Sequence, residues 1–170
     1  METNTVQTQK GIQNAIITSS DLLKHWQGHR RLTRRVIEAF PDDKLFTYSV
    51  GGMRPFSELA LEMIHMAAPG VRGVLTGKWA TFGEMEKEKL TPKTKEELLQ
   101  LWDKTTEQID ELWPQIPAER FREVDLAFGQ YEDVNYATVF YFIDNEIHHR
   151  GQGYVYLRSL GIEPPFFWER

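Results

Sequence analysis

Apolar residues recur at intervals of three and four along most of this chain, the spacing that places them on one face of a helix. The pattern predicts four long helices, over residues 20–40, 57–68, 94–113 and 135–160. Pro41 ends the first helix, and Pro69 breaks or kinks the second. Thr94, followed by Glu97, forms a capping box at the start of the third, and Gly161 ends the fourth.

The segments between these helices are long. Residues 41–55, 69–93 and 117–134 each exceed the length of a tight helical hairpin. The middle segment combines glycines with apolar residues, so it is either a mobile lid or an ordinary packed connection, with room for a short extra helix. Alternation over residues 121–126 is compatible with one extended piece, which by itself makes no sheet. The pattern therefore predicts an all-α fold, a four-helix bundle with long crossover connections.

The length of 170 residues fits one domain over residues 19–170, preceded by a loosely held arm over residues 1–18. Hydrophobic residues make up 41% of the chain and charged residues 26%, which is typical of soluble globular proteins. No apolar run approaches the roughly 18–20 residues required to span a bilayer. The N-terminus lacks the basic and apolar regions of a secretory signal. We therefore expect a cytoplasmic protein with no membrane contact.

Net charge and cysteine content limit the binding partners and the metal ligands that this chain could have. The net charge is -5, and the one basic cluster consists of Arg30, Arg31, Arg34 and Arg35. We interpret these arginines as a solvated helix face, because a nucleic-acid binder would need a broader positive surface. The chain has no cysteine, so any metal ion would have to be bound by His, Asp, Glu or amide side chains.

The last predicted helix carries the most distinctive polar residues. On a helical projection His149 lies within a wide apolar arc and His148 lies outside it, so His149 is the better inward ligand. Asn145 precedes His149 by four residues, and side chains at this spacing can reach one metal ion. Glu146 also lies within the arc, four residues before Arg150. Glu146 either forms a structural ion pair with Arg150 or acts near a metal as a base or hydrogen-bond acceptor.

Polar residues also interrupt the apolar faces of two other helices. Glu58, Glu62 and His65 share one face of the second helix, which is otherwise apolar. His25 and His29 are four residues apart on the first helix, and His29 lies near the middle of its apolar face. These positions predict a metal site between helices that uses His65, with His29 and His148 as spare ligand candidates.

Several of these residues match a known pattern. The matching residues near the end of the chain are His148, His149, Arg150, Gly151, Gln152, Leu157, Arg158, Gly161, Pro164 and Pro165. In this pattern the chain resembles the DinB family, damage-inducible proteins within a larger superfamily that includes thiol-dependent transferases. His65 in the second helix and Trp26 in the first also fit. The resemblance implies a four-helix bundle, usually a homodimer, with a divalent metal held by three histidines at one end.

The chain departs from the family motif at one metal position. The motif begins with a histidine where this sequence has Asn145, a neutral amide and a weaker donor than imidazole for zinc or nickel. Three outcomes follow. Asn145 binds the metal together with His65 and His149, or His29 or Glu146 takes its place, or the site is a metal-free remnant.

The resemblance implies a metal-dependent enzyme, in which an open coordination position polarises a substrate or activates water or a thiol. Transfer between a small thiol and an electrophile is one reaction class, and hydrolysis with Glu62 or Glu146 as the base is another. The rival interpretation is a non-catalytic, stress-associated dimer whose pocket is structural or binds a ligand. The aromatic tail over residues 164–168 packs either on its own bundle or on a partner chain.

Overall fold

The computed structural model describes residues 16–87 and 90–170, which are mostly helical. The long helices are α2 (Ser19–Ala39), α4 (Phe56–Thr76), α6 (Lys95–Leu112) and α7 (Asn135–Ser159). The short elements are helices α3 (Asp42–Leu45) and α5 (Phe82–Lys87), 3-10 helices η1 (Trp113–Gln115) and η2 (Ala118–Arg122), and strands β1 (Val124–Ala127) and β2 (Tyr131–Val134). The predicted helical class is confirmed. The arm expected over residues 1–18 lies outside the described residues, except for its last three.

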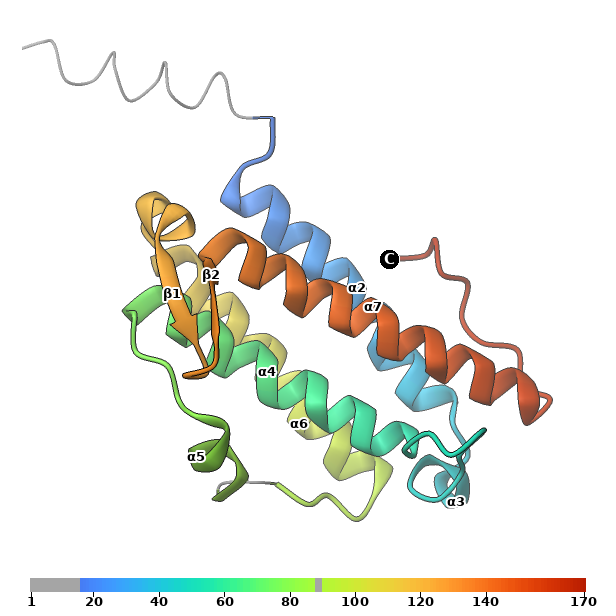
Figure 1. Ribbon diagram of the computed structural model, residues 1–170. Coiled ribbons are helices and arrows are strands. Elements are labelled where there is room, and N and C mark those ends of the chain that lie inside the picture. The colour runs from blue at the N-terminus through green and yellow to red at the C-terminus, as the bar shows by residue number, and fades with distance from the viewer. Residues whose placement is uncertain (1–15, 88–89) are drawn as a thin grey trace, which may run out of the picture.

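The long helices pack side by side, with α6 and α7 each in contact with both α2 and α4 (Figure 1). Two clusters of buried apolar side chains fill the space between them. One surrounds Trp26, Trp113 and Phe142, and the other surrounds Phe56 and Trp102. The hairpin formed by β1 and β2 contacts α4 and α7. No helix in the described part of the chain is both long enough and apolar enough to cross a membrane.

Two capping boxes define the starts of α2 and α6. The hydroxyl oxygen of Thr18 accepts a hydrogen bond from the backbone N–H of Asp21 at 3.1 Å, and that of Thr94 accepts one from Glu97 at 3.1 Å. In each box the carboxylate accepts a hydrogen bond from the threonine's backbone N–H in return. The capping box predicted at Thr94 is therefore confirmed.

Helix α4 is longer than the sequence predicts. It runs through Pro69 to Thr76, so of the two outcomes expected at the proline, a break or a kink, the break is wrong. The apolar face continues beyond the proline, because Val71 and Val74 are fully buried. Burial of this additional segment outweighs the backbone hydrogen bond that proline cannot donate. The helix ends instead at Gly77, whose φ of 69° lies in the left-handed region that favours glycine.

A small antiparallel sheet is the second departure from the expected fold. In the hairpin Val124 pairs with Val134 and Ala127 pairs with Tyr131. The extended piece expected near residues 121–126 is present over 124–127, but the expectation that it makes no sheet is wrong. Strand β2 was not predicted because apolar and polar residues do not alternate along it. Its first three residues are all exposed, so no face of the strand is marked by a buried row of apolar side chains.

The C-terminal tail returns to α2 (Figure 1). Arg35 forms an ion pair with Glu169 at 3.0 Å, and Nη1 of Arg170 lies 3.2 Å from Nε2 of His29. The aromatic side chains of residues 166–168 remain between 47% and 64% exposed. The tail therefore packs on its own chain through polar contacts, while its aromatic rings stay at the surface.

Helices α4 and α7 approach each other closely at two glycines. A Cβ atom on Gly153 would lie 2.5 Å from the ring of Phe56, and one on Gly70 would lie 2.4 Å from the ring of Phe142. Each ring thus fills the space that a side chain on the other helix would need. The two contacts leave no room for a methyl group without movement of the ring.

Substitution of Gly153 by alanine is expected to lower the free energy of unfolding by about 1–3 kcal/mol, because the added methyl overpacks the contact with Phe56. Urea unfolding followed by circular dichroism measures this change. Gly151→Ala is the matched control, since Gly151 lies in the same helix and a Cβ there meets no atom within 4 Å. The control should be neutral or stabilising, and equal losses in both variants would contradict the close approach of the two helices.

Candidate functional site

Glu62 on α4 is the centre of a polar cluster that joins α4 to α7. Its Oε1 atom accepts hydrogen bonds from Nε2 of His149 at 2.9 Å and from Nδ2 of Asn145 at 3.1 Å. Its Oε2 atom accepts from Nη2 of Arg54. On the far side of the imidazole, Nδ1 of His149 lies 2.7 Å from Oε1 of Gln152, one helical turn further along α7. Three donors thus converge on one carboxylate.

These contacts set the charges of the pair. The hydrogen bond from His149, with those from Arg54 and Asn145, outweighs burial and lowers the pKa of Glu62 to about 2. Burial opposes protonation of His149, but the hydrogen bonds to Glu62 and Gln152 are stronger and raise its pKa. Both ring nitrogens of His149 face oxygen acceptors, and only an imidazolium can donate to both. These contacts favour the carboxylate form of Glu62 and the imidazolium form of His149.

A cavity of about 1080 Å³ lies against this cluster, bounded by α4, α5, the hairpin and α7. Glu62 and His65 are part of its wall, together with Arg54 and Glu58. The apolar wall includes Phe46, Leu61, Met66, Phe82, Phe128 and Phe142. His149 and Asn145 are not part of the wall. Glu62 is therefore the residue that links the buried cluster to the cavity.

The predicted metal ligands are placed as follows. Asn145 and His149 meet at Glu62, and His65 lies on the cavity wall three residues after Glu62 on the same helix. Within residues 16–87 and 90–170, no group of three His, Asp or Glu side chains is arranged to hold a metal ion. Nε2 of His149 and Oε1 of Glu62 are hydrogen-bonded to each other, and Asn145 presents its nitrogen to the carboxylate. As arranged, these donors do not fit a three-ligand centre.

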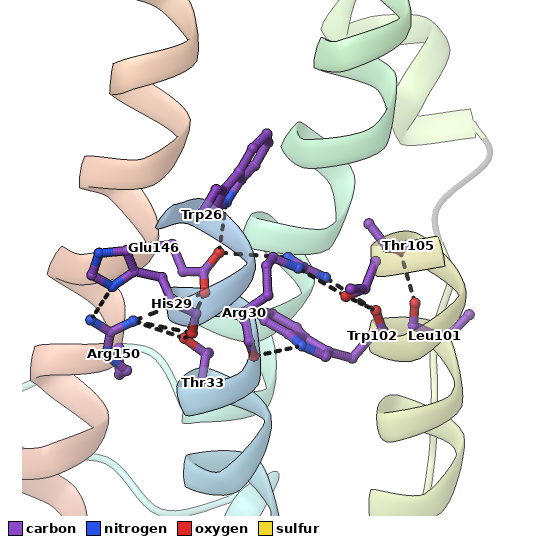
Figure 2. Close-up of polar contacts among 10 residues, drawn as sticks. Trp26, His29, Arg30, Thr33, Leu101, Trp102, Thr105, Glu146 and Arg150 are labelled. Atoms are coloured by element: carbon purple, nitrogen blue, oxygen red, sulfur yellow. Dashed lines mark hydrogen bonds and ion pairs between the residues drawn. The ribbon is translucent and has the colours of Figure 1, made fainter. Parts of the chain in front are cut away.

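Glu146 belongs to a different, buried network between α7 and α2 (Figure 2). Its Oε2 atom accepts a hydrogen bond from Nε1 of Trp26 at 3.1 Å, and its Oε1 atom accepts one from Thr33 at 2.7 Å. The nearest cationic atoms are Nη1 of Arg30 at 3.7 Å and Nη1 of Arg150 at 4.0 Å. The Arg150 partner predicted for Glu146 is present, but Arg30 lies closer. This placement favours the ion-pair interpretation of Glu146 over a role as base.

Arg30 is buried, so the expectation that all four arginines of this cluster form a solvated face is wrong at this position. Its guanidinium carbon lies 3.6 Å from the ring centroid of Trp102, and its Nη2 donates to the Trp102 carbonyl at 3.1 Å. Burial lowers the pKa of Arg30 to about 10, against the charge of Glu146, which raises it. The arginine remains a cation and balances the buried carboxylate.

The spare ligand His29 lies in the same network as Glu146. Its Nδ1 atom lies 2.9 Å from Nη2 of Arg150 (Figure 2). Its Nε2 atom lies 3.2 Å from Nε2 of His25. Burial and the charge of Arg150 lower the pKa of His29 to about 3, so the ring is neutral and accepts from Arg150. Among the described contacts of His29, none is with Glu62 or His149.

The two neighbouring histidines of α7 differ as the projection predicts. His149 is buried and His148 is exposed, with their ring centroids 5.1 Å apart. Sequence reasoning gave no role to Gln152 or Arg54. Gln152 lies three residues after His149, a spacing that places both on one helix face and was available as a signal. Arg54 precedes α4 in a connecting segment, where no periodicity reports the direction of a side chain.

The chain is similar to known proteins over almost its whole length. A family model described as the DinB family matches residues 5–169. A solved DinB-like protein from Bacillus subtilis is 20% identical and superimposes with a TM-score of 0.70, covering 88% of this chain and 99% of that one. A DinB-like protein from Bacillus cereus ATCC 10987 is 17% identical, with a TM-score of 0.65 and coverage of 86% and 95%.

A third solved structure is a mycothiol-dependent maleylpyruvate isomerase, 13% identical, with a TM-score of 0.63. The match covers 81% of this chain and 61% of the isomerase. A comparison with curated protein sequences found no match. At these identities the structural likeness shows a shared fold, and a fold by itself specifies no chemistry.

Proposed function

The chain belongs to the DinB family, and from that premise we propose that it binds a small organic molecule in the cavity beside Glu62. One observation carries the proposal: a carboxylate on the wall of a large cavity is held in place from behind by Asn145 and His149. Apolar walls with a few fixed polar groups are the usual make-up of a ligand site. In this proposal the four long helices form the family's four-helix bundle and support the cavity.

The charges of the pair assign the roles. A carboxylate with a pKa of about 2 stays ionised at neutral pH and accepts a proton only weakly, so Glu62 is better suited to anchor a ligand by hydrogen bonding than to act as a general base. His149 is then a positioning residue, because its imidazolium holds the Glu62 carboxylate toward the cavity. Gln152 in turn holds the ring of His149.

Binding in the cavity can be tested with benzyl alcohol, a small neutral aromatic molecule. Ligand-observed NMR should detect binding with a Kd of about 1 mM, the range that eight non-hydrogen atoms can support. Ala137 lies on the cavity wall, so Ala137→Trp should fill part of the cavity and weaken binding about 10-fold or more.

Ala118→Trp is the matched control for this test. Ala118 is exposed in η2 and lies outside the cavity wall, so the affinity should be unchanged. Absence of binding to the wild-type chain, or equal affinity in the wild type and Ala137→Trp, would contradict the proposal. Circular dichroism of both variants confirms that they fold.

A second candidate function, metal-dependent transfer or hydrolysis, is favoured by Asn145. Its Oδ1 atom is buried and has no hydrogen-bond partner among the described residues, a condition that a bound cation would relieve. This candidate would need His65, Asn145 and His149 to adopt a three-ligand arrangement that the described residues do not show, and zinc or nickel bound there would supply Lewis acidity. Binding would require His149 to leave Glu62. A small thiol and an electrophile are the substrates that this candidate takes, while the homodimer and the cytoplasmic location stay predictions.

A further inference from the structure

The cavity beside Glu62 is lined by unequal numbers of acidic and basic side chains. Four carboxylates lie on its wall, those of Glu58, Glu62, Glu132 and Asp133, and among the described residues of the wall the one arginine or lysine is Arg54. The guanidinium of Arg54 is already paired with Glu62. Within the described residues, Glu58, Glu132 and Asp133 form no ion pair with a basic side chain. Glu132 alternates with Asp133 along β2 and lies opposite the exposed Leu126, so its side chain belongs to the outer face of the hairpin. Among the described residues of the wall, Glu58 and Asp133 therefore remain without a basic side chain to balance them.

Aromatic rings form a continuous wall next to these carboxylates. Phe82 stacks on Phe128 with ring centroids 5.1 Å apart, and its other neighbour is Tyr131 at 6.2 Å. Phe128 in turn contacts Phe142 at 6.1 Å. The four rings come from α5, the hairpin and α7, and all of them line the cavity. Aromatic faces carry partial negative charge and attract cations, especially where water is excluded.

We infer that the cavity selects small organic cations, in which an ammonium group is attached to an apolar or aromatic body. The ammonium lies near Glu58 and Asp133, and the apolar body lies against the ring wall. The negative charge of these carboxylates repels anionic ligands, so molecules that carry a carboxylate should bind weakly. This inference rests on the proposal that the cavity binds a small molecule, and it adds the charge of that molecule.

Three ligands with one phenyl ring test the inference: benzylamine, a cation, benzyl alcohol, which is neutral, and benzoate, an anion. Isothermal titration at pH 7 and low salt should give benzylamine a Kd about 10-fold lower than that of benzyl alcohol. Benzoate should bind about 10-fold more weakly than benzyl alcohol, or not detectably. Raising the salt concentration should reduce the preference for benzylamine, because the carboxylates are exposed and their field is screened.

The double variant Glu58→Gln/Asp133→Asn should lose most of the preference for benzylamine over benzyl alcohol. Both residues are exposed, so neither substitution disturbs the core. Glu163→Gln is the matched control, an exposed glutamate outside the cavity wall, and it should keep the preference. The inference is overturned if benzylamine binds no more tightly than benzyl alcohol, or if the double variant keeps the preference. In either case binding of benzyl alcohol would still support the proposed function. Failure of the charge preference can therefore be distinguished from failure of the cavity to bind a small molecule.

Discussion

Replacement of Glu146 by alanine is expected to lower the free energy of unfolding by about 3–5 kcal/mol, the cost of removing one partner of a buried ion pair. Arg30 is 1% exposed and would keep its charge without the carboxylate that balances it. The indole N–H of Trp26 and the hydroxyl of Thr33 would also lose the acceptor that they share. Urea unfolding at pH 7, followed by circular dichroism, measures the loss. Glu146→Gln keeps the shape and one acceptor oxygen, and its loss should be intermediate.

Glu38→Ala is the control for the Glu146 variants. Glu38 pairs with Arg34 on the surface of α2, where the side chain of Arg34 is 36% exposed and that of Glu38 is 45% exposed. Its removal should cost about 1 kcal/mol or less, since solvent screens exposed pairs. If Glu146→Ala costs no more than Glu38→Ala, the buried network does not stabilise the fold. Glu146 would then regain its place as a candidate for chemistry.

The second large effect concerns metal binding. Asn145→His is expected to raise the affinity for zinc about 10-fold or more, because imidazole is a better zinc ligand than an amide and residue 145 lies one helical turn before His149. Competition with a chromophoric chelator at pH 7.5 gives the affinity, and elemental analysis of untagged protein purified without chelator gives the stoichiometry. The wild-type chain should hold less than one ion per subunit, and the variant should hold about one.

Two controls separate a specific site from adventitious binding. Addition of His149→Ala to Asn145→His should abolish the gain, whereas His148→Ala should not, because the His148 side chain is exposed. If the wild-type chain already holds one ion per subunit, the Glu62 and His149 pair opens on metal binding and the second candidate function takes the lead. If Asn145→His gains nothing, the three-ligand site implied by the family resemblance is absent from this chain.

The helices were predictable from sequence because their signals are local. The capping box at Thr94 and the inward position of His149 each depend on residues within one or two turns, and both were identified. The continuation of α4 through Pro69 was missed because it depends on burial of Val71 and Val74 against other helices. A strong local stop signal was overridden by tertiary packing, which no window of sequence reports.

The candidate site was predicted in part. Glu62, Asn145 and His149 were all selected from sequence, but their meeting at one carboxylate joins residues 83 and 87 positions apart. A helical projection shows the face on which a residue lies. It does not show the axial register of two packed helices, which decides whether two residues on facing helices come into contact. Arg30 illustrates the same limit, since its neighbours in sequence are cationic and its balancing charge comes from Glu146, 116 residues away.

The two glycine contacts determine the axial register of α4 and α7. Phe56 on α4 meets Gly153 on α7, and Phe142 on α7 meets Gly70 on α4, so the antiparallel helices engage at two levels. The hydrogen bond between Glu62 and His149 lies between these levels. A shift of α7 by one turn would separate the ring of Phe56 from Gly153 and would carry His149 past Glu62. The two glycines thus fix the axial register of α4 and α7. Relatives that keep both glycines should keep the carboxylate and the imidazole paired, even where the rest of the cavity wall has changed.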